Sequence, residues 1–254
     1  MRCFCQRVLH VQMSRTLVGS LCLVAGCTSA PDLDAVIAKH VEARGGAAAI
    51  ESIQAFEADI RIVESTFEVD GTYVATRDGR MRIDIRVGGD RVFTEALDYG
   101  RAWSWSPDTG VIEGSAKGAA ALRHGIEFPF KLFGLHEMQR RGHWLELTGR
   151  ESIDGIGYYV LRLTLDDGFE SLYYMHPETW MIERDRQLRA LHVDVDPTLE
   201  WIETTYSDFR EVGGLLFAHR QVERKVDSGE VLSTGTISAI RLNVPLADAR
   251  FLPP

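Results

Sequence analysis

The chain has 254 residues, with 28 Lys and Arg against 37 Asp and Glu, and a formal net charge of −9 at pH 7. An acidic surface repels phosphate backbones and anionic lipid, so the charge argues against a nucleic-acid partner and against adhesion to a membrane by charge alone. The length is sufficient for one all-β domain with a full core.

The first 26 residues differ from the rest of the chain. They contain Arg2, Arg7 and Arg15 and no acidic residue, and they continue into an apolar run over residues 16–26. A basic start, an apolar stretch of roughly 7–15 residues and small residues at its end are typical of a secretory signal. The run is shorter than the ~20 residues that span a bilayer. We therefore predict a cleaved signal peptide over residues 1–26. The sequence leaves open whether translation starts at Met1 or at Met13.

The signal ends in Val24-Ala25-Gly26-Cys27, which resembles the bacterial lipobox. The resemblance implies that Cys27 is diacylated on sulfur and becomes the new N-terminus, and two or more acyl chains hold a protein stably to a membrane. The residue after Cys27 is Thr28, whereas an Asp at this position favours retention in the inner membrane in enterobacterial lipoproteins. The resemblance thus implies a lipid anchor on the periplasmic side of the cell envelope, in the outer rather than the inner membrane. An ordinary signal peptide with Cys27 as a free thiol stays open.

The mature chain would start at this cysteine. Cys3, Cys5 and Cys22 lie in the removed segment, so no disulfide and no thiolate metal cluster is expected within the mature chain. Removing the three arginines leaves 25 basic against 37 acidic residues, a net charge of −12. Residues 27–31 form a short tether, and residues 32–254 are predicted as a single domain.

A helix opens this domain. Asp32 is a plausible N-cap, an apolar stripe recurs at helical spacing, and Gly45-Gly46 ends the helix. We interpret His40 on this stripe as a half-buried, hydrogen-bonded histidine rather than a ligand. Residues 47–53 predict a second short helical piece.

From Ala55 the hydrophobic period changes from helical to two, as over residues 81–87, where apolar residues alternate with Arg82, Asp84 and Arg86. Such alternation predicts strands with one apolar and one wet face. Short strands with local turns between them predict an antiparallel meander that curls into a barrel or half-barrel. The predicted strands are 55–64, 68–77, 80–87, 91–97, 101–106, 143–150, 157–165, 170–176, 180–186, 200–208, 215–226, 230–236 and 238–244. Residues 115–142 break the pattern and predict a mostly helical insertion over the open side of the sheet.

No catalytic constellation emerges from the sequence. It holds no Gly-rich phosphate loop, G-x-S-x-G elbow or H-E-x-x-H motif, and Ser104 and Ser106 have no base at recognisable spacing. Residues 192–196 (HVDVD) place an imidazole and two carboxylates on one strand face, but a metal needs three or four converging ligands. A polar strand edge leading to the Pro197 turn is the preferred interpretation. We therefore predict no catalytic residue, no metal and no cofactor, hence no enzyme.

Apolar and aromatic strand faces are the most prominent feature. Trp103 and Trp105 share one face, and similar faces follow on later strands. Such faces usually fill a core, but a sheet that curves through many strands encloses space that its own side chains need not fill. The sequence leaves packed and hollow interiors open. For a hollow one, the predicted lining is Trp103, Trp105, Leu161, Leu163, Tyr174 and Trp180.

Several segments in order resemble a family of outer-membrane lipoprotein-sorting proteins. They are residues 142–151 (GHWLELTGRE), 153–155 (IDG), 159–161 (YVL), 174–179 (YMHPET), 206–214 (YSDFREVGG) and 243–254. The family usually has an Asp before the Pro of the fourth segment, where this chain has His176. The resemblance implies a LolA/LolB-like fold, which is a mainly β, unclosed antiparallel β-barrel with capping helices around an apolar cavity for acyl chains.

The function that this resemblance implies is non-enzymatic binding of a lipid or lipoprotein by a membrane-anchored periplasmic protein, in lipoprotein sorting or envelope maintenance. One alternative is an envelope scaffold or stress sensor that has a filled core and binds a protein partner. Another is a hydrolase with a histidine and a carboxylate within hydrogen-bond reach of Ser104, Ser106 or a bound metal. The sequence indicates neither the ligand nor the oligomeric state.

Overall fold

The computed structural model describes residues 31–254. The signal peptide, Cys27 and most of the tether therefore lie outside the described residues. Among those described, no helix has the length and apolarity needed to cross a bilayer.

The first helix has the predicted caps. In α1 (Leu33–Arg44) the Asp32 side chain accepts a hydrogen bond from the Ala35 amide at 2.9 Å. Gly45 closes the helix with φ 118°, and a Cβ at this position would collide with the carbonyl oxygen of Gly214. Only glycine satisfies both conditions, because it has no Cβ and adopts the left-handed region freely. A shorter helix, α2 (Ala47–Glu51), follows.

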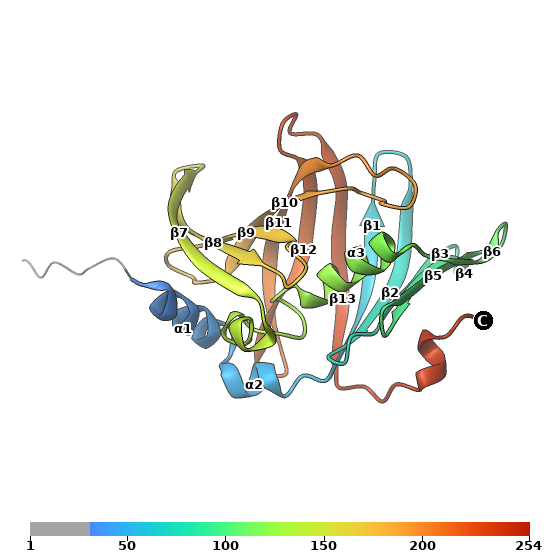
Figure 1. Ribbon diagram of the computed structural model, residues 1–254, viewed down its shortest axis with the longest axis horizontal. Coiled ribbons are helices and arrows are strands. Elements are labelled where there is room, and N and C mark those ends of the chain that lie inside the picture. Colours follow the sequence, from blue (N-terminus) through green and yellow to red (C-terminus); the bar gives the residue numbers. More distant parts are fainter. Residues whose placement is uncertain (1–30) are drawn as a thin grey trace, which may run out of the picture. The chain divides into compact units, whose positions relative to one another are not determined.

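Thirteen strands form one antiparallel sheet (Figure 1). The strands before the insertion are β1 (Ala55–Val63), β2 (Glu68–Thr76), β3 (Met81–Val87), β4 (Asp90–Asp98), β5 (Arg101–Ser106) and β6 (Gly110–Glu113). Those after it are β7 (Trp144–Ile153), β8 (Ile156–Thr164), β9 (Glu170–Met175), β10 (Ile182–Arg189), β11 (Glu200–Val212), β12 (Leu215–Lys225) and β13 (Val231–Leu242). Their order is β6-β5-β4-β3-β2-β1-β13-β12-β11-β10-β9-β8-β7.

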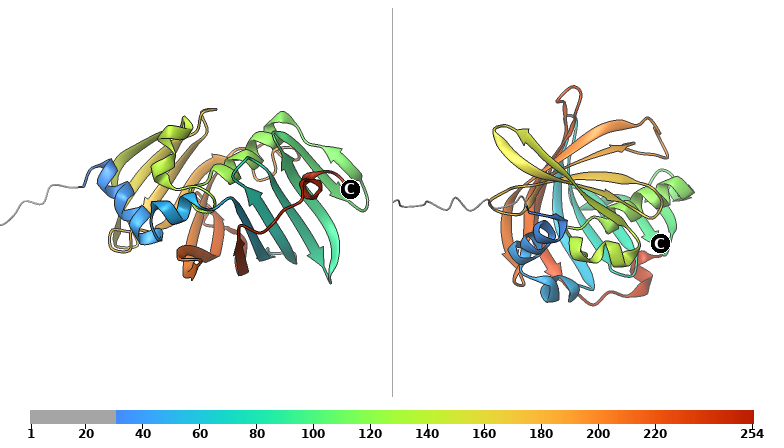
Figure 2. Two further views of the ribbon diagram at one scale, coloured as in Figure 1. Left: turned by 90° about the horizontal axis from the view of Figure 1, so that it is seen from below. Right: turned by 60° about the vertical axis from the view of Figure 1, so that its left-hand side comes forward.

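The two edge strands, β6 and β7, do not pair, so the curled sheet is an unclosed barrel, as predicted. The chain must pass from one edge to the other, and it does so through α3 (Ala116–Glu127), η1 (Leu135–Glu137) and η2 (Gln139–Arg141). Figures 1 and 2 show α3 lying inside the curve of the sheet. The helical insertion predicted over residues 115–142 is thus this crossing, with Ser115 as the N-cap that accepts from the Gly118 amide at 3.0 Å.

The structure corrects three predictions of strands. One strand, β13, replaces the two predicted over 230–236 and 238–244. Asp59 pairs with Ala239 and Ile60 with Ile237, so Ser238 is an extra residue in a bulge that interrupts the alternation. Trp180 has φ 57° in the turn before β10 rather than lying on that strand. The short edge strand β6 was not predicted, because its four residues carry little pattern.

The main core lies inside the curve of the sheet. It joins α1, the 130–138 segment and the inward side chains of both halves of the sheet, including Leu161 and Leu163. A small second cluster of Tyr158, Val160 and Tyr174 lies on the other face of β8 and β9.

Candidate functional site

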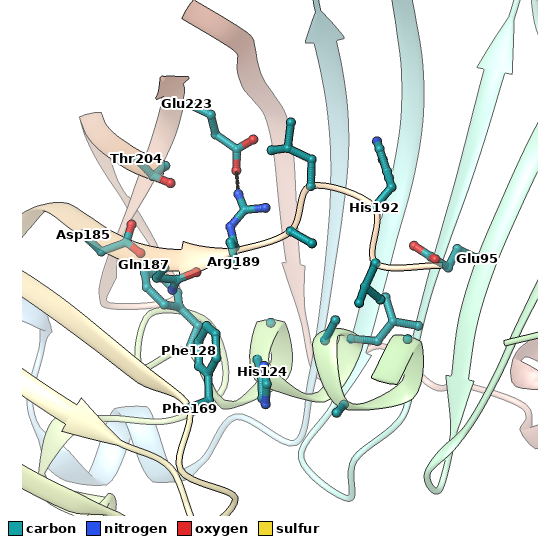
Figure 3. A pocket seen from close by; sticks show the side chains of 18 of the residues that line it. Glu95, His124, Phe128, Phe169, Asp185, Gln187, Arg189, His192, Thr204 and Glu223 are labelled. Atoms are coloured by element: carbon teal, nitrogen blue, oxygen red, sulfur yellow. Dashed lines mark hydrogen bonds and ion pairs between the residues drawn. The ribbon is translucent and has the colours of Figure 1, made fainter. Parts of the chain in front are cut away.

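A cavity of about 900 Å³ lies between the sheet, α3 and the loop over residues 190–199 (Figure 3). This volume is at the upper end of the ~300–1,000 Å³ that is usual for small-molecule sites. Because β6 and β7 stay apart, the helix closes the interior only partly, and the sheet behind it is broad enough to leave space.

The small residues of α3 create much of this space. Gly118, Ala120, Ala121 and Gly125 line the cavity, together with Leu122. Across from them the sheet contributes buried apolar side chains, namely Phe56, Ala102, Phe217 and Ile240. A helix that presents Ala and Gly to a sheet does not fill the gap, so the hollow follows from the composition of one helix face.

Aromatic rings form one wall of the cavity. Phe128 and Phe130 stack at 5.4 Å between ring centroids, and Phe130 stacks on Tyr206 at 5.1 Å. Phe169 also lines the cavity and stacks on His124 at 4.0 Å. These pairs fix the rings against one another and present a rigid apolar surface.

The segment that carries Phe128 and Phe130 is held by a buried cation. The Arg44 guanidinium, fully buried at the end of α1, donates to the carbonyl oxygens of Pro129, Phe130 and Phe133 at 3.0–3.2 Å. Burial lowers the pKa of Arg44 to about 10. Since three backbone acceptors replace water, the segment is pinned to α1.

A polar group lies at one end of the cavity. Asp185 on β10 is 2% exposed and accepts a hydrogen bond from the Tyr206 hydroxyl at 2.9 Å. Burial raises the pKa of the Asp185 carboxyl to about 7 and that of the Tyr206 hydroxyl well above its usual range. Beside them, Arg189 donates to Glu223 at 2.8 Å. Figure 3 shows Glu95 across the cavity from Asp185, and burial raises the pKa of Glu95 as well.

The loop over residues 190–199 forms the rim of the cavity, and its apolar side chains are exposed. Val195 is 87% and Leu199 is 60% exposed, and both line the cavity. This loop contains the HVDVD segment, in which His192 and Asp196 form an isolated bridge while Asp194 accepts from the Ser115 amide at 3.1 Å. The three polar side chains thus do not converge, and residues 31–254 contain no cluster of metal-ligating side chains.

Trp103 and Trp105 share a strand face, but the two rings lie on the far side of the sheet. Their neighbour Ala102 belongs to the main core, and successive side chains of a strand alternate. The Trp103 Nε1 donates to the Phe251 carbonyl oxygen at 2.9 Å, and Arg91 lies 4.3 Å from the Trp105 ring. Trp103 is among the residues that line the cavity, whereas Trp105 is not.

The other four predicted lining residues lie away from the cavity. Leu161 and Leu163 are buried in the main core, and Tyr174 lies in the small cluster on the other face, with its hydroxyl bonded to Glu151 at 3.0 Å. Trp180 stacks on Tyr159 at 5.3 Å, and its carbonyl oxygen bonds the Nδ1 of His40 at 2.8 Å. His40 is fully buried rather than half-buried, and burial lowers its pKa to about 3.

Histidine–carboxylate pairs occur apart from the serines considered as nucleophiles. In the described part of the chain these pairs are His124–Asp167, His136–Glu51 and His143–Glu127. The hydroxyl of Ser106 instead bonds Thr109 at 2.8 Å, and none of the three histidines within residues 31–254 bonds Ser104 or Ser106.

The fold is shared with solved structures of low sequence identity. A LolA superfamily protein from Nitrosomonas europaea aligns with a TM-score of 0.55 and 17% identity, over 88% of this chain and 98% of its own. A domain described as an outer membrane lipoprotein-sorting protein from Vibrio parahaemolyticus gives 0.56 and 12%, over 80% and 92%. A DUF1329 family protein from Desulfovibrio piger gives 0.56 and 17%, over 87% and 98%.

These likenesses establish the fold: the chain has the LolA/LolB-like, unclosed β-barrel architecture that its sequence predicted. No family model matches the sequence. No curated protein matches it either.

Proposed function

We propose that the protein binds the acyl chain of a lipid or lipoprotein in this cavity without converting it chemically. The observation that carries the proposal is the space of about 900 Å³ between the Ala- and Gly-rich face of α3 and the apolar sheet. Moving hydrocarbon from water into such a space stabilises a complex by ~0.8 kcal/mol per buried CH₂ group. The aromatic wall and the exposed apolar rim suit a chain that enters from a membrane or from another carrier.

The alternative of a scaffold with a filled core fits this interior less well. The interior is not filled, and leaving the apolar side chains that line it exposed to water is unfavourable unless a ligand covers them. The fold, which is shared with a LolA superfamily protein, also accords with a carrier. One fold serves many functions, so the cavity carries the proposal.

The test is to purify the full-length protein from membranes, exchange the detergent, extract it with organic solvent and identify bound lipid by mass spectrometry. We expect an acyl-chain lipid to copurify in a defined ratio. A matched pair on one helix provides the control, since Ala120 lines the cavity and Ala116 does not. Ala120→Trp should lose the lipid and Ala116→Trp should retain it. Equal lipid content in both variants, or none in the wild type, would contradict the proposal.

The location belongs to the same proposal. We place the protein on the periplasmic side of the cell envelope, in the outer membrane, with the lipid on Cys27 as its anchor. The intact mass of the mature protein should show an acylated N-terminal cysteine, and replacing residues 1–27 with a cleavable signal peptide that lacks a lipobox should move the protein from the membrane fraction to the soluble periplasmic fraction. A mature chain with an unmodified Cys27 would overturn the anchor and leave the cavity proposal intact.

A further inference from the structure

One cation on the cavity wall differs from the others. Lys131 lines the cavity, and its ammonium has neither an ion pair nor a hydrogen bond within residues 31–254. Its Nζ lies 4.3 Å from the centre of the Tyr73 ring, which is a cation–π contact. By contrast, Arg189 is paired with Glu223 at 2.8 Å, and His124 with Asp167 at 2.8 Å.

The remaining basic side chains of the lining, Lys117, His192 and Arg220, are exposed and therefore hydrated. Lys131 is instead half-buried among aromatic side chains, and its desolvation lowers its pKa to about 8. The ammonium stays charged at neutral pH in a place where water cannot fully solvate it. Such a charge is costly unless a counter-ion approaches it.

The carboxylates of the cavity do not supply this counter-ion. Glu223, the acid that acts on Lys131, already accepts from Arg189 and from the Ser233 hydroxyl. Asp185 is engaged by Tyr206, and no carboxylate of the described chain lies within 4.0 Å of the Lys131 ammonium. The backbone that carries Lys131 is held in place, because Arg44 donates to the carbonyl oxygens of Phe130 and Phe133.

We propose that Lys131 is the head-group site of the cavity, and that the ligand is an amphiphile with an anionic head, a carboxylate or a phosphate, whose chain lies against α3. This inference rests on the proposed function and adds the chemical class of the ligand. An ion pair formed in a desolvated site is stronger than one at the surface, and it orients the chain toward the apolar wall.

The experiment compares palmitate with palmityl alcohol, which has the same chain without the charge, by displacement of a fluorescent fatty-acid probe from the full-length protein. Lys131→Met should lower the affinity for palmitate by about tenfold, as expected for loss of one charged contact. The affinity for palmityl alcohol should stay within about twofold of the wild-type value. Lys131→Arg should restore palmitate. Lys39→Met, a matched loss of charge at an exposed lysine that also contacts an aromatic ring but lies outside the cavity lining, should change the affinity for neither ligand.

Further arms distinguish the sources of the anion. Lysophosphatidate should compete like palmitate and should also depend on Lys131, whereas inorganic phosphate in large excess should not compete. The inference would be overturned if Lys131→Met lowered the affinities for palmitate and palmityl alcohol equally, or if inorganic phosphate alone displaced the probe. If the wild type binds palmityl alcohol as tightly as palmitate, the head-group site fails while chain binding stands. If it binds neither, the proposed function itself fails.

Discussion

The interior of the curved sheet has a filled part and a hollow part. Under α1, the segment over residues 130–138 contributes Leu132, Phe133 and Met138, each completely buried. Under α3, the facing residues are Ala120, Ala121 and neighbouring glycines, and a cavity remains. The sheet offers apolar side chains in both parts, so the covering element decides whether the interior is core or binding site.

The largest effect should come from the filled part. Phe133→Ala removes a buried ring that also lies over Arg77 and Arg141, and we expect a loss of about 3–5 kcal/mol in the free energy of unfolding. Urea denaturation measures it. The control is Trp144→Ala, a 67% exposed position that should change stability by no more than about 0.5 kcal/mol. A loss at Phe133 no larger than the loss at Trp144 would show that the part of the interior under α1 is not tightly packed.

The second prediction concerns Asp185 in the hollow part. Its folded pKa is raised to about 7 from an ordinary 3.8, so between these pH values the unfolded chain is ionised while the folded one keeps its proton. The folded state binds more protons there, and its stability therefore falls as pH rises through this window and stays low above it. Asp185→Asn should thus be more stable than the wild type at pH 8, by up to about 4 kcal/mol, with the difference disappearing toward pH 4.

Unfolding by urea at the two pH values tests this prediction. Asp70→Asn, which removes an exposed carboxylate, should show no comparable pH-dependent gain. An Asp185→Asn variant less stable than the wild type at pH 8 would show that the ionised carboxylate supports the fold.

Filling the cavity should separate binding from stability. Ala120→Trp should weaken binding of a fluorescent fatty acid by about tenfold or more, because the indole takes the space of the chain, whereas Ala116→Trp should not. The free energy of unfolding, measured by thermal denaturation, should change by less than about 1 kcal/mol in both variants, since neither position lies in the filled core. A parallel loss of stability and binding would instead make α3 part of the core.

The smallest effect is expected at the rim. Val195→Asp should slow the transfer of a fluorescent fatty acid from neutral vesicles a few-fold, because an exposed apolar rim favours contact with lipid. Stopped-flow fluorescence measures the rate. Val231→Asp, also exposed but outside the cavity lining, is the control, and equal slowing in both variants would exclude a specific role for the rim.

Local patterns predicted much of the fold. Strict alternation located strands such as β3, and Asp32 and Gly45 located the ends of α1, because these signals depend on few neighbouring residues. The bulge at Ser238 was not predictable in this way, since a bulge is defined by the partner strand. The resemblance in the C-terminal segments supplied the unclosed barrel.

The sequence left packed and hollow interiors open, and of the six residues predicted to line a hollow one, Trp103 alone is at the cavity. The two tryptophans of β5 do share a face, but their rings pack with the C-terminal Phe251 and with Arg91 on the other side of the sheet. Which face of a strand points into the barrel depends on packing with segments that are distant in the sequence, and the local alternation of apolar and polar residues carries no information on it. The informative signal was the run Ala119–Leu122, whose small side chains cannot fill a broad sheet, followed by Phe128-Pro129-Phe130.

A crystal structure with a terminally brominated fatty acid would test the central claim most directly. The account predicts anomalous signal inside the cavity, between Ala120 on α3 and Phe217 and Ile240 on the sheet, with the carboxylate at Lys131. Bromine bound only on the outer surface, or a cavity that collapses around its own side chains in the presence of the ligand, would contradict it.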